Sequence, residues 1–390
     1  MNFDKLKGVE IVLVSTVPFF LVNQLARHIR NLKEKGMRIT LVTSAGDELE
    51  EFMDDELIRV VTVDIARKID LWKDLKVLFF LVKLFARQNY TIMHSTTPKA
   101  GLLCAIASKL TRVPIRLHTF TGQVWLTKTG LMKGILQYLD KVIVLLDTHC
   151  YTDSLSQRDL LIDSGIAEIK SISTYGEGSL AGVDLERFSQ LKYSVEFKKE
   201  LKQSIGFKND TFVLTFIGRL TRDKGIYELL ASFEQLQSKH SNIGLIILGP
   251  MEEVENTILE NKISSLSDVY WGGNVSEPEK FLSITDVLCL PSYREGFGTV
   301  VIEAAAMGVP TVGCEVSGLV DAVEQGVTGL LVPPRNINAY TEAVDKLICD
   351  KSLLQTMKCA AKIRCERYFD SHKVNEYVVV EYLRWLSNLH

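Results

Sequence analysis

The sequence lacks the cysteine and histidine patterns that hold metal ions or disulfide frameworks. Its seven cysteines are scattered without a C-x-x-C pair, and its seven histidines include no H-E-x-x-H motif. Scattered thiols are typical of proteins that stay in a reducing compartment. We therefore expect a cytoplasmic protein with no metal site.

Long apolar runs and an excess of basic residues are also absent. The most apolar stretch, 77–82, ends at Lys83 and is far shorter than the roughly 20 residues that cross a bilayer. Residues 1–5 do not begin the apolar core of a signal peptide. The formal net charge of −3 argues against a nucleic-acid partner. These absences predict a soluble protein.

What the chain does contain is a repeated alternation of apolar strands and helices. Its 390 residues suggest two domains. Short apolar runs such as Val9–Ser15 and Arg38–Thr43 alternate with helical segments as far as an expected strand at Lys141–Leu146, and the alternation restarts at Phe212–Gly218. This rhythm is typical of a parallel sheet covered on both faces. The predicted fold class is α/β, with two Rossmann-like doubly wound domains.

The glycine-rich segment Gly176–Gly182 marks the predicted domain boundary. We expect a first domain at 1–182, a second at 183–370, and a helix at 371–390 that folds back across the first domain. Open α/β sheets bind ligands at the carboxyl ends of their strands. Two such domains facing each other predict a ligand cleft between them.

The most informative segment runs from Pro291 to Pro310 (PSYREGFGTVVIEAAAMGVP). A strand ends at Pro291, a loop with two glycines follows, and a helix begins near Gly298. A helix N-terminus carries about half a positive charge and suits a diphosphate. Glu295 is placed to bind sugar hydroxyls and Glu303 to bind a ribose. An ordinary solvated glutamate is the alternative for each, but an unpaired carboxylate within VVIEAAAMG would be costly to bury.

A second segment, Phe216–Gly225 (FIGRLTRDKG), follows the first strand of the second domain. Arg219 can bind phosphate oxygens with two nitrogens, and Lys224 adds a point charge beside it. Two fixed cations would stabilise a diphosphate as it leaves. Each cation taken alone has a solvated surface position as its alternative.

These segments, with the boundary at 176–188, resemble the retaining glycosyltransferases of family 4, which have the GT-B fold. The likeness covers nearly the whole chain and is strongest over 218–334. It implies that Arg219, Lys224 and Glu295 act at the reacting sugar and leaving group, with no catalytic metal and no cofactor. The donor-binding residues that it implies are Gly218, Arg219, Lys224, Asn274, Val275, Glu295, Gly296, Phe297, Gly298, Thr299 and Glu303.

The first domain departs from the family pattern. Its first turn, 15–20, lacks the glycine pair that many relatives have, and Thr119–Gly122 (TFTG) places Thr121 where relatives have the histidine of T-x-H-G. For His118, strand packing and a catalytic role are both open. The candidate acceptor-binding residues are Thr16, Thr97, Lys99, His118, Thr121 and Gly122.

The resemblance implies transfer of a hexose or N-acetylhexosamine from a nucleotide-sugar donor, expected to be a uridine diphosphate sugar. The run TFTGQVW, at 119–125, resembles enzymes that build bacterial surface polysaccharides such as capsule and lipopolysaccharide, which implies a glycan or polyprenyl-diphosphate-linked saccharide as acceptor. Leu126–Lys141 then either packs in the core or contacts the inner face of the cytoplasmic membrane as a peripheral helix. A nucleotide-sugar epimerase and a non-catalytic nucleotide-sugar-binding subunit are the alternative functions.

Overall fold

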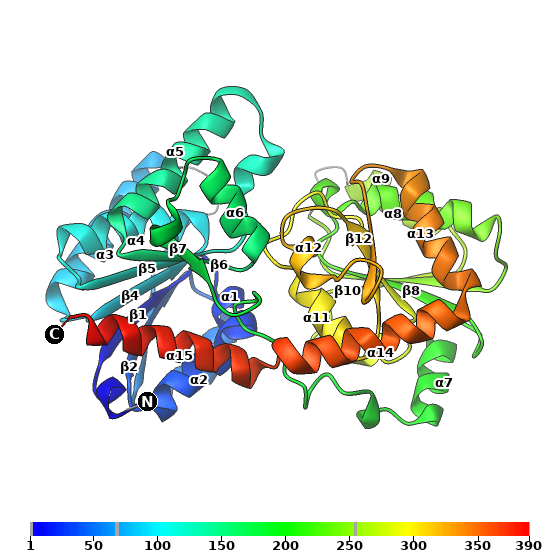
Figure 1. Ribbon diagram of the computed structural model, residues 1–390, viewed down its shortest axis with the longest axis horizontal. Helices are drawn as coiled ribbons and strands as arrows, with labels where there is room; N and C mark the ends of the chain where they lie inside the picture. The colour runs from blue at the N-terminus through cyan, green and yellow to red at the C-terminus, as the bar shows by residue number, and fades with distance from the viewer. Residues whose placement is uncertain (1–2, 67–69, 253–255, 390) are drawn as a thin grey trace. The chain divides into compact units, whose positions relative to one another are not determined.

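The computed structural model describes residues 3–66, 70–252 and 256–389. Met1 and Asn2, which entered the signal-peptide argument, lie outside this range. The chain forms two compact units (Figure 1). Unit 1 comprises Met1–Gly182 with Ser371–His390, and unit 2 comprises Val183–Asp370. The functional roles expected for the two domains remain predictions.

Unit 1 contains a parallel sheet with the strand order β3-β2-β1-β4-β5-β6-β7. The strands are β1 (Glu10–Val14), β2 (Arg38–Thr43), β3 (Ile58–Thr62), β4 (Ile92–Thr96), β5 (Ile115–Phe120), β6 (His149–Thr152) and β7 (Ile172–Thr174). The order reverses between β1 and β4, so the loops that follow these two strands diverge there. This is the position at which doubly wound sheets bind ligands.

Helices cover both faces of the unit 1 sheet. They are η1 (Phe3–Leu6), α1 (Pro18–Gln24), α2 (Ala26–Glu34), η2 (Asp47–Phe52), α3 (Leu71–Arg87), α4 (Pro98–Leu110), η3 (Val124–Thr127), α5 (Gly130–Leu146), α6 (Leu155–Asp163), η4 (Ile169–Ser171) and α15 (Ser371–Ser387). Right-handed crossovers place α3, α4 and α5 on one face, where they pack side by side, and α2 on the other. The C-terminal helix α15 lies against α2 (Figure 1).

The strand expected at Lys141–Leu146 is wrong. These residues form the last turns of α5, and the strand of this region is β6, a few residues later. A short apolar run does not distinguish a strand from one side of a helix. In α5 the run is split between the buried Ile143 and the exposed Leu145.

Unit 2 contains a second parallel sheet, with the strand order β10-β9-β8-β11-β12-β13. The strands are β8 (Phe212–Ile217), β9 (Ile243–Leu248), β10 (Val269–Gly273), β11 (Val287–Leu290), β12 (Thr311–Cys314) and β13 (Gly329–Val332). The order reverses between β8 and β11. The predicted α/β class with two doubly wound sheets is therefore confirmed.

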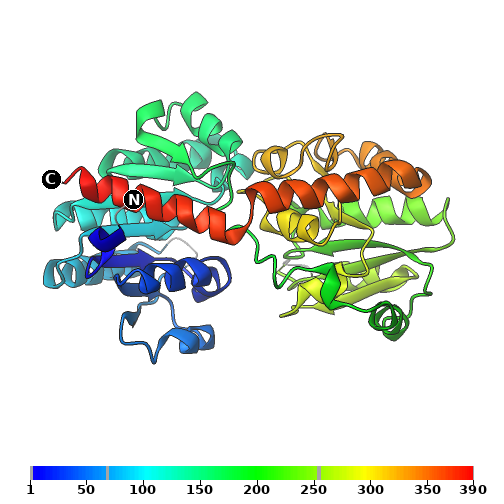
Figure 2. The same cartoon turned by 60° about the horizontal axis from the view of Figure 1, so that its bottom comes forward.

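Helices also lie on both sides of the strands of unit 2 (Figure 2). They are η5 (Gln190–Lys192), α7 (Val195–Ser204), η6 (Arg222–Lys224), α8 (Ile226–Gln237), α9 (Asn256–Ser265), α10 (Pro278–Leu282), α11 (Thr299–Ala306), α12 (Leu319–Ala322), α13 (Ile337–Cys349) and α14 (Lys351–Tyr368). All six residues of β9 are buried, as expected for a central strand of a sheet that is covered on both faces.

A buried polar network attaches α15 to the sheet of unit 1. The hydroxyl of Tyr382 is hydrogen-bonded to Nδ1 of His94 at 2.6 Å, and both side chains are buried. The indole Nε1 of Trp385 donates to the hydroxyl of Tyr151 at 2.8 Å. Buried polar groups are costly unless they are paired. Removal of α15 would therefore expose apolar surface and also take away the α15 partners of the Nδ1 of His94 and the hydroxyl of Tyr151.

We expect the Tyr382→Phe variant to destabilise unit 1 by roughly 1–3 kcal/mol, because His94 loses a buried partner. Urea unfolding of the full chain measures this change. Tyr377→Phe is the matched control, since Tyr377 lies in the same helix and is 47% exposed. Equal stability of the two variants would contradict a role for the buried hydrogen bond.

Unit 1 should also lose stability as the solution is acidified. Burial lowers the pKa of His28 to about 4 and that of His118 to about 3. Both imidazoles are thus neutral in the folded state near pH 6, whereas the unfolded chain takes up protons below about pH 6.5. The stability they contribute is complete above pH 6.5 and falls by up to about 1.4 kcal/mol per histidine for each pH unit towards pH 4. Urea unfolding at pH 7.5, 6 and 5 tests this; a constant free energy of unfolding for unit 1 would refute it.

Candidate active site

Two loops meet at the point in unit 2 where the strand order reverses. Residues 218–225 follow β8 and residues 291–298 follow β11, and these two parallel strands pair with each other. Gly225 has a φ of +71°, and a Cβ on it would lie 2.1 Å from the carbonyl oxygen of Pro291. Only glycine allows this close approach. The two predicted motifs are therefore packed against each other at the ligand-binding edge of the sheet.

Charged side chains from the two loops are paired across this contact. The Nζ of Lys224 lies 2.6 Å from Oε1 of Glu295, and both side chains are mostly buried. Arg294 similarly lies 3.0 Å from Asp223, which also accepts a hydrogen bond from the hydroxyl of Thr221. The structure thus brings two predicted residues, Lys224 and Glu295, into direct contact. An anion that binds here has to compete with Glu295 for the ammonium group.

Arg219 lies nearer the surface of the same loop. Its Nη1 is 2.9 Å from Oε2 of Glu252, and its side chain is 42% exposed. The preceding residue, Gly218, donates its backbone N–H to Leu248 at the end of β9. Arg219 is therefore held on the side of the loop that faces β9, with its guanidinium accessible to a ligand.

Three of the predicted donor-binding residues, Phe297, Gly298 and Thr299, lie where the helix α11 begins. Gly298 adopts the left-handed conformation with a φ of +85°, and Thr299 is the first helical residue. The side chain of Phe297 is buried in the core of unit 2, with its ring 5.3 Å from that of Phe369. A Cβ on Gly318 would lie 2.5 Å from the carbonyl oxygen of Gly296. A third loop, which follows β12, therefore supports the start of α11.

Glu303 lies in α11, one turn into the helix. Burial raises the pKa of Glu303 to about 7, and the nearby guanidinium of Arg187 opposes this rise. Arg187 binds Glu279 with two nitrogens, at 3.0 Å and 2.9 Å. Arg187 is not among the site residues predicted from the sequence. The only feature of the sequence that could have pointed to Arg187 is its position in the segment 183–188, which follows the domain boundary.

The far side of the site lies at the end of β10. Asn274 and Val275 follow this strand, which is two strands, about 10 Å, from β8. Gly249 joins the strand ends: its N–H donates to Gly273, and a Cβ on it would lie 1.9 Å from the carbonyl oxygen of Gly218. The predicted residues of unit 2 therefore all follow carboxyl ends of strands in one sheet or lie in the helix that begins there.

In unit 1, two predicted residues meet at the corresponding reversal of strand order. Thr16 follows β1 and Thr97 follows β4, and their hydroxyl oxygens are 2.7 Å apart. Thr97 has a φ of +69°, which is strained for a β-branched residue. Thr121 and Gly122 follow the adjacent strand β5. Lys99 points instead to Asp74 of α3, with 2.8 Å between Nζ and Oδ1.

His118 differs from the other acceptor candidates. Its side chain has no exposed surface, its Nδ1 is hydrogen-bonded to Oγ of Ser95, and a Cβ on Gly101 would lie 2.4 Å from its ring. The imidazole is thus enclosed between β5 and α4. Of the two interpretations left open by the sequence, strand packing explains this position, and contact of His118 with an acceptor would require the ring to become exposed.

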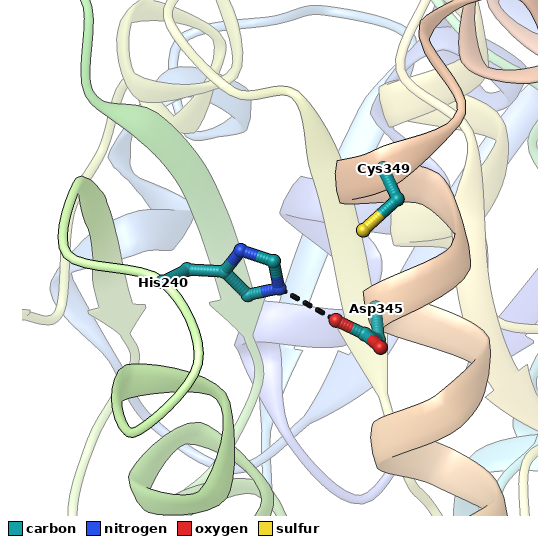
Figure 3. A group of neighbouring side chains, drawn as sticks. All are labelled: His240, Asp345 and Cys349. Carbon is teal, nitrogen blue, oxygen red and sulfur yellow. Dashed lines mark hydrogen bonds and ion pairs between the residues drawn. The ribbon is translucent and has the colours of Figure 1, made fainter.

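One group of possible metal ligands occurs among the residues that the structure describes. His240, Asp345 and Cys349 place their ligand atoms within 4.8 Å of one another (Figure 3). Asp345 is paired with His240 at 2.5 Å and with Lys239 at 3.5 Å. His240 precedes β9, so this group lies near the amino ends of the strands, at the edge opposite to the candidate site. It takes no part in the chemistry considered there.

Comparison with known proteins agrees with this geometry. Residues 197–364 match the model of the family described as glycosyl transferases group 1, and residues 22–169 match a glycosyl transferase 4-like domain. The chain is 34% identical to the capsular polysaccharide biosynthesis glycosyltransferase CapM of Staphylococcus aureus, over 91% of this chain and 92% of that protein. The chain belongs to the group 1 glycosyltransferases. The predicted resemblance to family 4 is thereby confirmed.

Further similarities support the GT-B fold of this glycosyltransferase. It is 25% identical to the UDP-Gal:alpha-D-GlcNAc-diphosphoundecaprenol alpha-1,3-galactosyltransferase of Escherichia coli, over 83% of this chain and 84% of that enzyme. The structure of Anabaena Alr3699/HepE in complex with UDP and glucose superposes with a TM-score of 0.79 at 19% identity, over 97% of this chain and all of that one. Among the residues described here, no helix is both long and apolar enough to span a membrane.

Replacing Gly225 should disrupt the contact between the loops that follow β8 and β11. Gly225→Ala introduces a strained φ and a clash with Pro291, whereas Gly206→Ala has a similar φ of +85° but no atom within 4 Å of the added Cβ. We expect Gly225→Ala to cost about 1–3 kcal/mol more of unfolding free energy than Gly206→Ala, because only Gly225 is overpacked. Denaturant unfolding of unit 2 measures both variants. Equal losses would show that the loops do not depend on this contact.

Proposed function

We propose that this glycosyltransferase transfers a hexose or N-acetylhexosamine, with retention of configuration, from a UDP-sugar to a lipid-linked glycan during the synthesis of a surface polysaccharide. The observation that carries the proposal is the pairing of Lys224 with Glu295 where β8 and β11 diverge. A cation for phosphate and a carboxylate for sugar hydroxyls stand within 2.6 Å of each other there.

The donor would bind along the carboxyl edge of the unit 2 sheet. Its diphosphate would lie between Arg219, Lys224 and the first turn of α11, where backbone N–H groups and the helix dipole favour negative charge. Glu295 would bind the sugar and Glu303 the ribose. Since burial raises the pKa of Glu303 to about 7, hydrogen bonds from ribose hydroxyls to the ionised carboxylate would lower that pKa again. A UDP donor fits the names of the Escherichia coli relative and the Anabaena complex.

The chemical step would break the bond between the anomeric carbon and the diphosphate oxygen. Negative charge then develops on that oxygen, and Arg219 and Lys224 would stabilise it. The acceptor hydroxyl would form the new bond to the anomeric carbon on the same face, and its proton would pass to the leaving phosphate. No protein nucleophile and no metal ion is assigned to this step.

The acceptor would be held by unit 1. Thr16 and Thr97 offer hydroxyls at the reversal of strand order, and Thr121 and Gly122 follow the neighbouring strand. The relatives include an enzyme whose name specifies a diphosphoundecaprenol-linked acceptor, which supports a polyprenyl-diphosphate-linked saccharide here. Such a substrate would place the enzyme at the cytoplasmic face of the membrane. Lys99 would bind the acceptor only after its ion pair with Asp74 is broken.

A donor screen tests the proposal. We expect uridine diphosphate sugars, and not guanosine or adenosine ones, to raise the thermal stability of the protein, by about 2.7 kcal/mol at a hundredfold excess over Kd. Glu303→Gln should lose most of this response because an amide is a poorer acceptor for the paired ribose hydroxyls. Glu342→Gln, an exposed glutamate of the same unit, is the control.

Turnover of the stabilising donor, with and without a lipid-linked acceptor, then separates the functions. Transfer requires both substrates, an epimerase consumes the donor alone, and a binding subunit consumes neither. If Glu303→Gln responds like wild type, the assignment of the donor site is wrong.

A further inference from the structure

The beginning of α5 presents apolar side chains to solvent. Leu126 and every residue from Thr127 to Ile135 are exposed, and Leu131 is 82% exposed. Figure 1 shows these first turns of α5 projecting from unit 1. Scattered exposed leucines are ordinary on protein surfaces, but a contiguous apolar group marks an interaction site.

The helix α3 carries a second exposed apolar stripe. Leu71, Leu75 and Phe79 recur every four residues and therefore share one side of the helix, with Trp72 beside them at 80% exposure. The buried side of α3 is formed by other residues, Val77, Leu81 and Phe85. Packing on the sheet consequently accounts for only one of the two apolar sides of this helix.

The two exposed groups lie in the same layer of unit 1. The helix α4 packs against α3 on one side and against α5 on the other. Both apolar groups occupy the N-terminal part of their helix, and each helix begins at the carboxyl edge of the sheet. The pair formed by Lys99 and Asp74 ties the first turn of α4 to that of α3. Thr16 and Thr97 follow strands at this same edge.

The charges around these groups are mainly basic. In and beside α3, the basic residues Lys73, Lys76, Lys83 and Arg87 outnumber the acidic residues Asp64, Asp70 and Asp74. Asp64 is paired with Lys73, and Asp74 with Lys99. Residues 126–141 contain three lysines and only Asp140. Asp140 is buried and accepts a hydrogen bond from the indole of Trp125 at 2.8 Å, so it does not offset the lysines at the surface.

We propose that the α3–α5 surface, defined as Leu71, Trp72, Leu75 and Phe79 with Leu126, Leu131, Met132 and Ile135, inserts into the interface of a bilayer that contains anionic lipids. Apolar side chains among lysines are the combination that binds such an interface, with each lysine attracted to the negative surface and each apolar group removed from water. A second copy of this chain would supply no complementary negative charge from the same surface.

This inference rests on the proposed function, because the proposed membrane contact explains how a lipid-linked acceptor would reach unit 1. A saccharide attached to a membrane lipid would be presented beside the bilayer. The α3–α5 surface adjoins the edge of unit 1 that carries Thr16 and Thr97, so docking there would bring the saccharide to that edge. Diffusion of the acceptor within the membrane would then replace its capture from solution.

Co-sedimentation of the full chain with vesicles tests the proposal. We expect binding to phosphatidylglycerol–phosphatidylcholine vesicles at low salt and at least about tenfold weaker binding to phosphatidylcholine alone. The Leu131→Ser/Ile135→Ser and Trp72→Ser/Phe79→Ser double variants should each weaken binding about tenfold. Leu145→Ser is the matched control, because Leu145 is 78% exposed but lies at the other end of α5. It should bind like wild type.

Three outcomes overturn the inference: no vesicle binding, equal loss in the Leu145→Ser control, or a concentration-dependent dimer of the wild type that the double variants abolish. Circular dichroism shows whether the double variants remain folded. Donor turnover with a short-chain, water-soluble acceptor separates this inference from the proposed function. Turnover without vesicle binding refutes only the α3–α5 surface, whereas vesicle binding without any turnover refutes only the proposed function.

Discussion

The backbone contact between Gly225 and Pro291 fixes the geometry on which the rest of unit 2 depends. Because Gly225 has no side chain, the loop after β8 can lie against the loop after β11, and the helix α8 starts immediately beyond it. This proximity sets the distance between Lys224 and Glu295. Gly249 and Gly318 provide equally close contacts on either side, so the charged groups of the site are held by a series of side-chain-free backbone positions.

The two units carry different side chains at the same position of their sheets. In unit 2 the loops at the reversal of strand order carry charged residues that neutralise one another. In unit 1 the corresponding loops carry hydroxyl groups, with Thr16 and Thr97 in contact. Fixed charge suits a diphosphate, whereas neutral donors and acceptors suit the hydroxyls of a saccharide. This contrast supports the proposal that unit 2 binds the donor and unit 1 binds the acceptor, although both units have the same type of fold.

Much of this arrangement follows from local patterns in the sequence. Short apolar strands, glycine-rich loops and helices that begin after them predict both sheets and bring Lys224 and Glu295 to one edge. The error at Lys141–Leu146 arose because VIVLL is equally compatible with a strand and with one side of α5. Arg187 was missed because its partner, Glu279, is 92 positions away. The enclosure of His118 depends on Gly101 in α4, and periodicity within one strand carries no information about that contact.

The hydrogen bond between His94 and Tyr382 spans 288 positions of the chain and joins residues that lie on opposite sides of the whole of unit 2 in sequence. During synthesis, the sheet of unit 1 is made first, but the helix that pairs with its buried histidine emerges from the ribosome only after the whole of unit 2. Unit 2 can fold as a domain in the interval, since domains generally fold as units. Until α15 arrives, one side of unit 1 remains open to water and to chaperones. Completion of unit 1 therefore requires that the whole of unit 2 has already been translated.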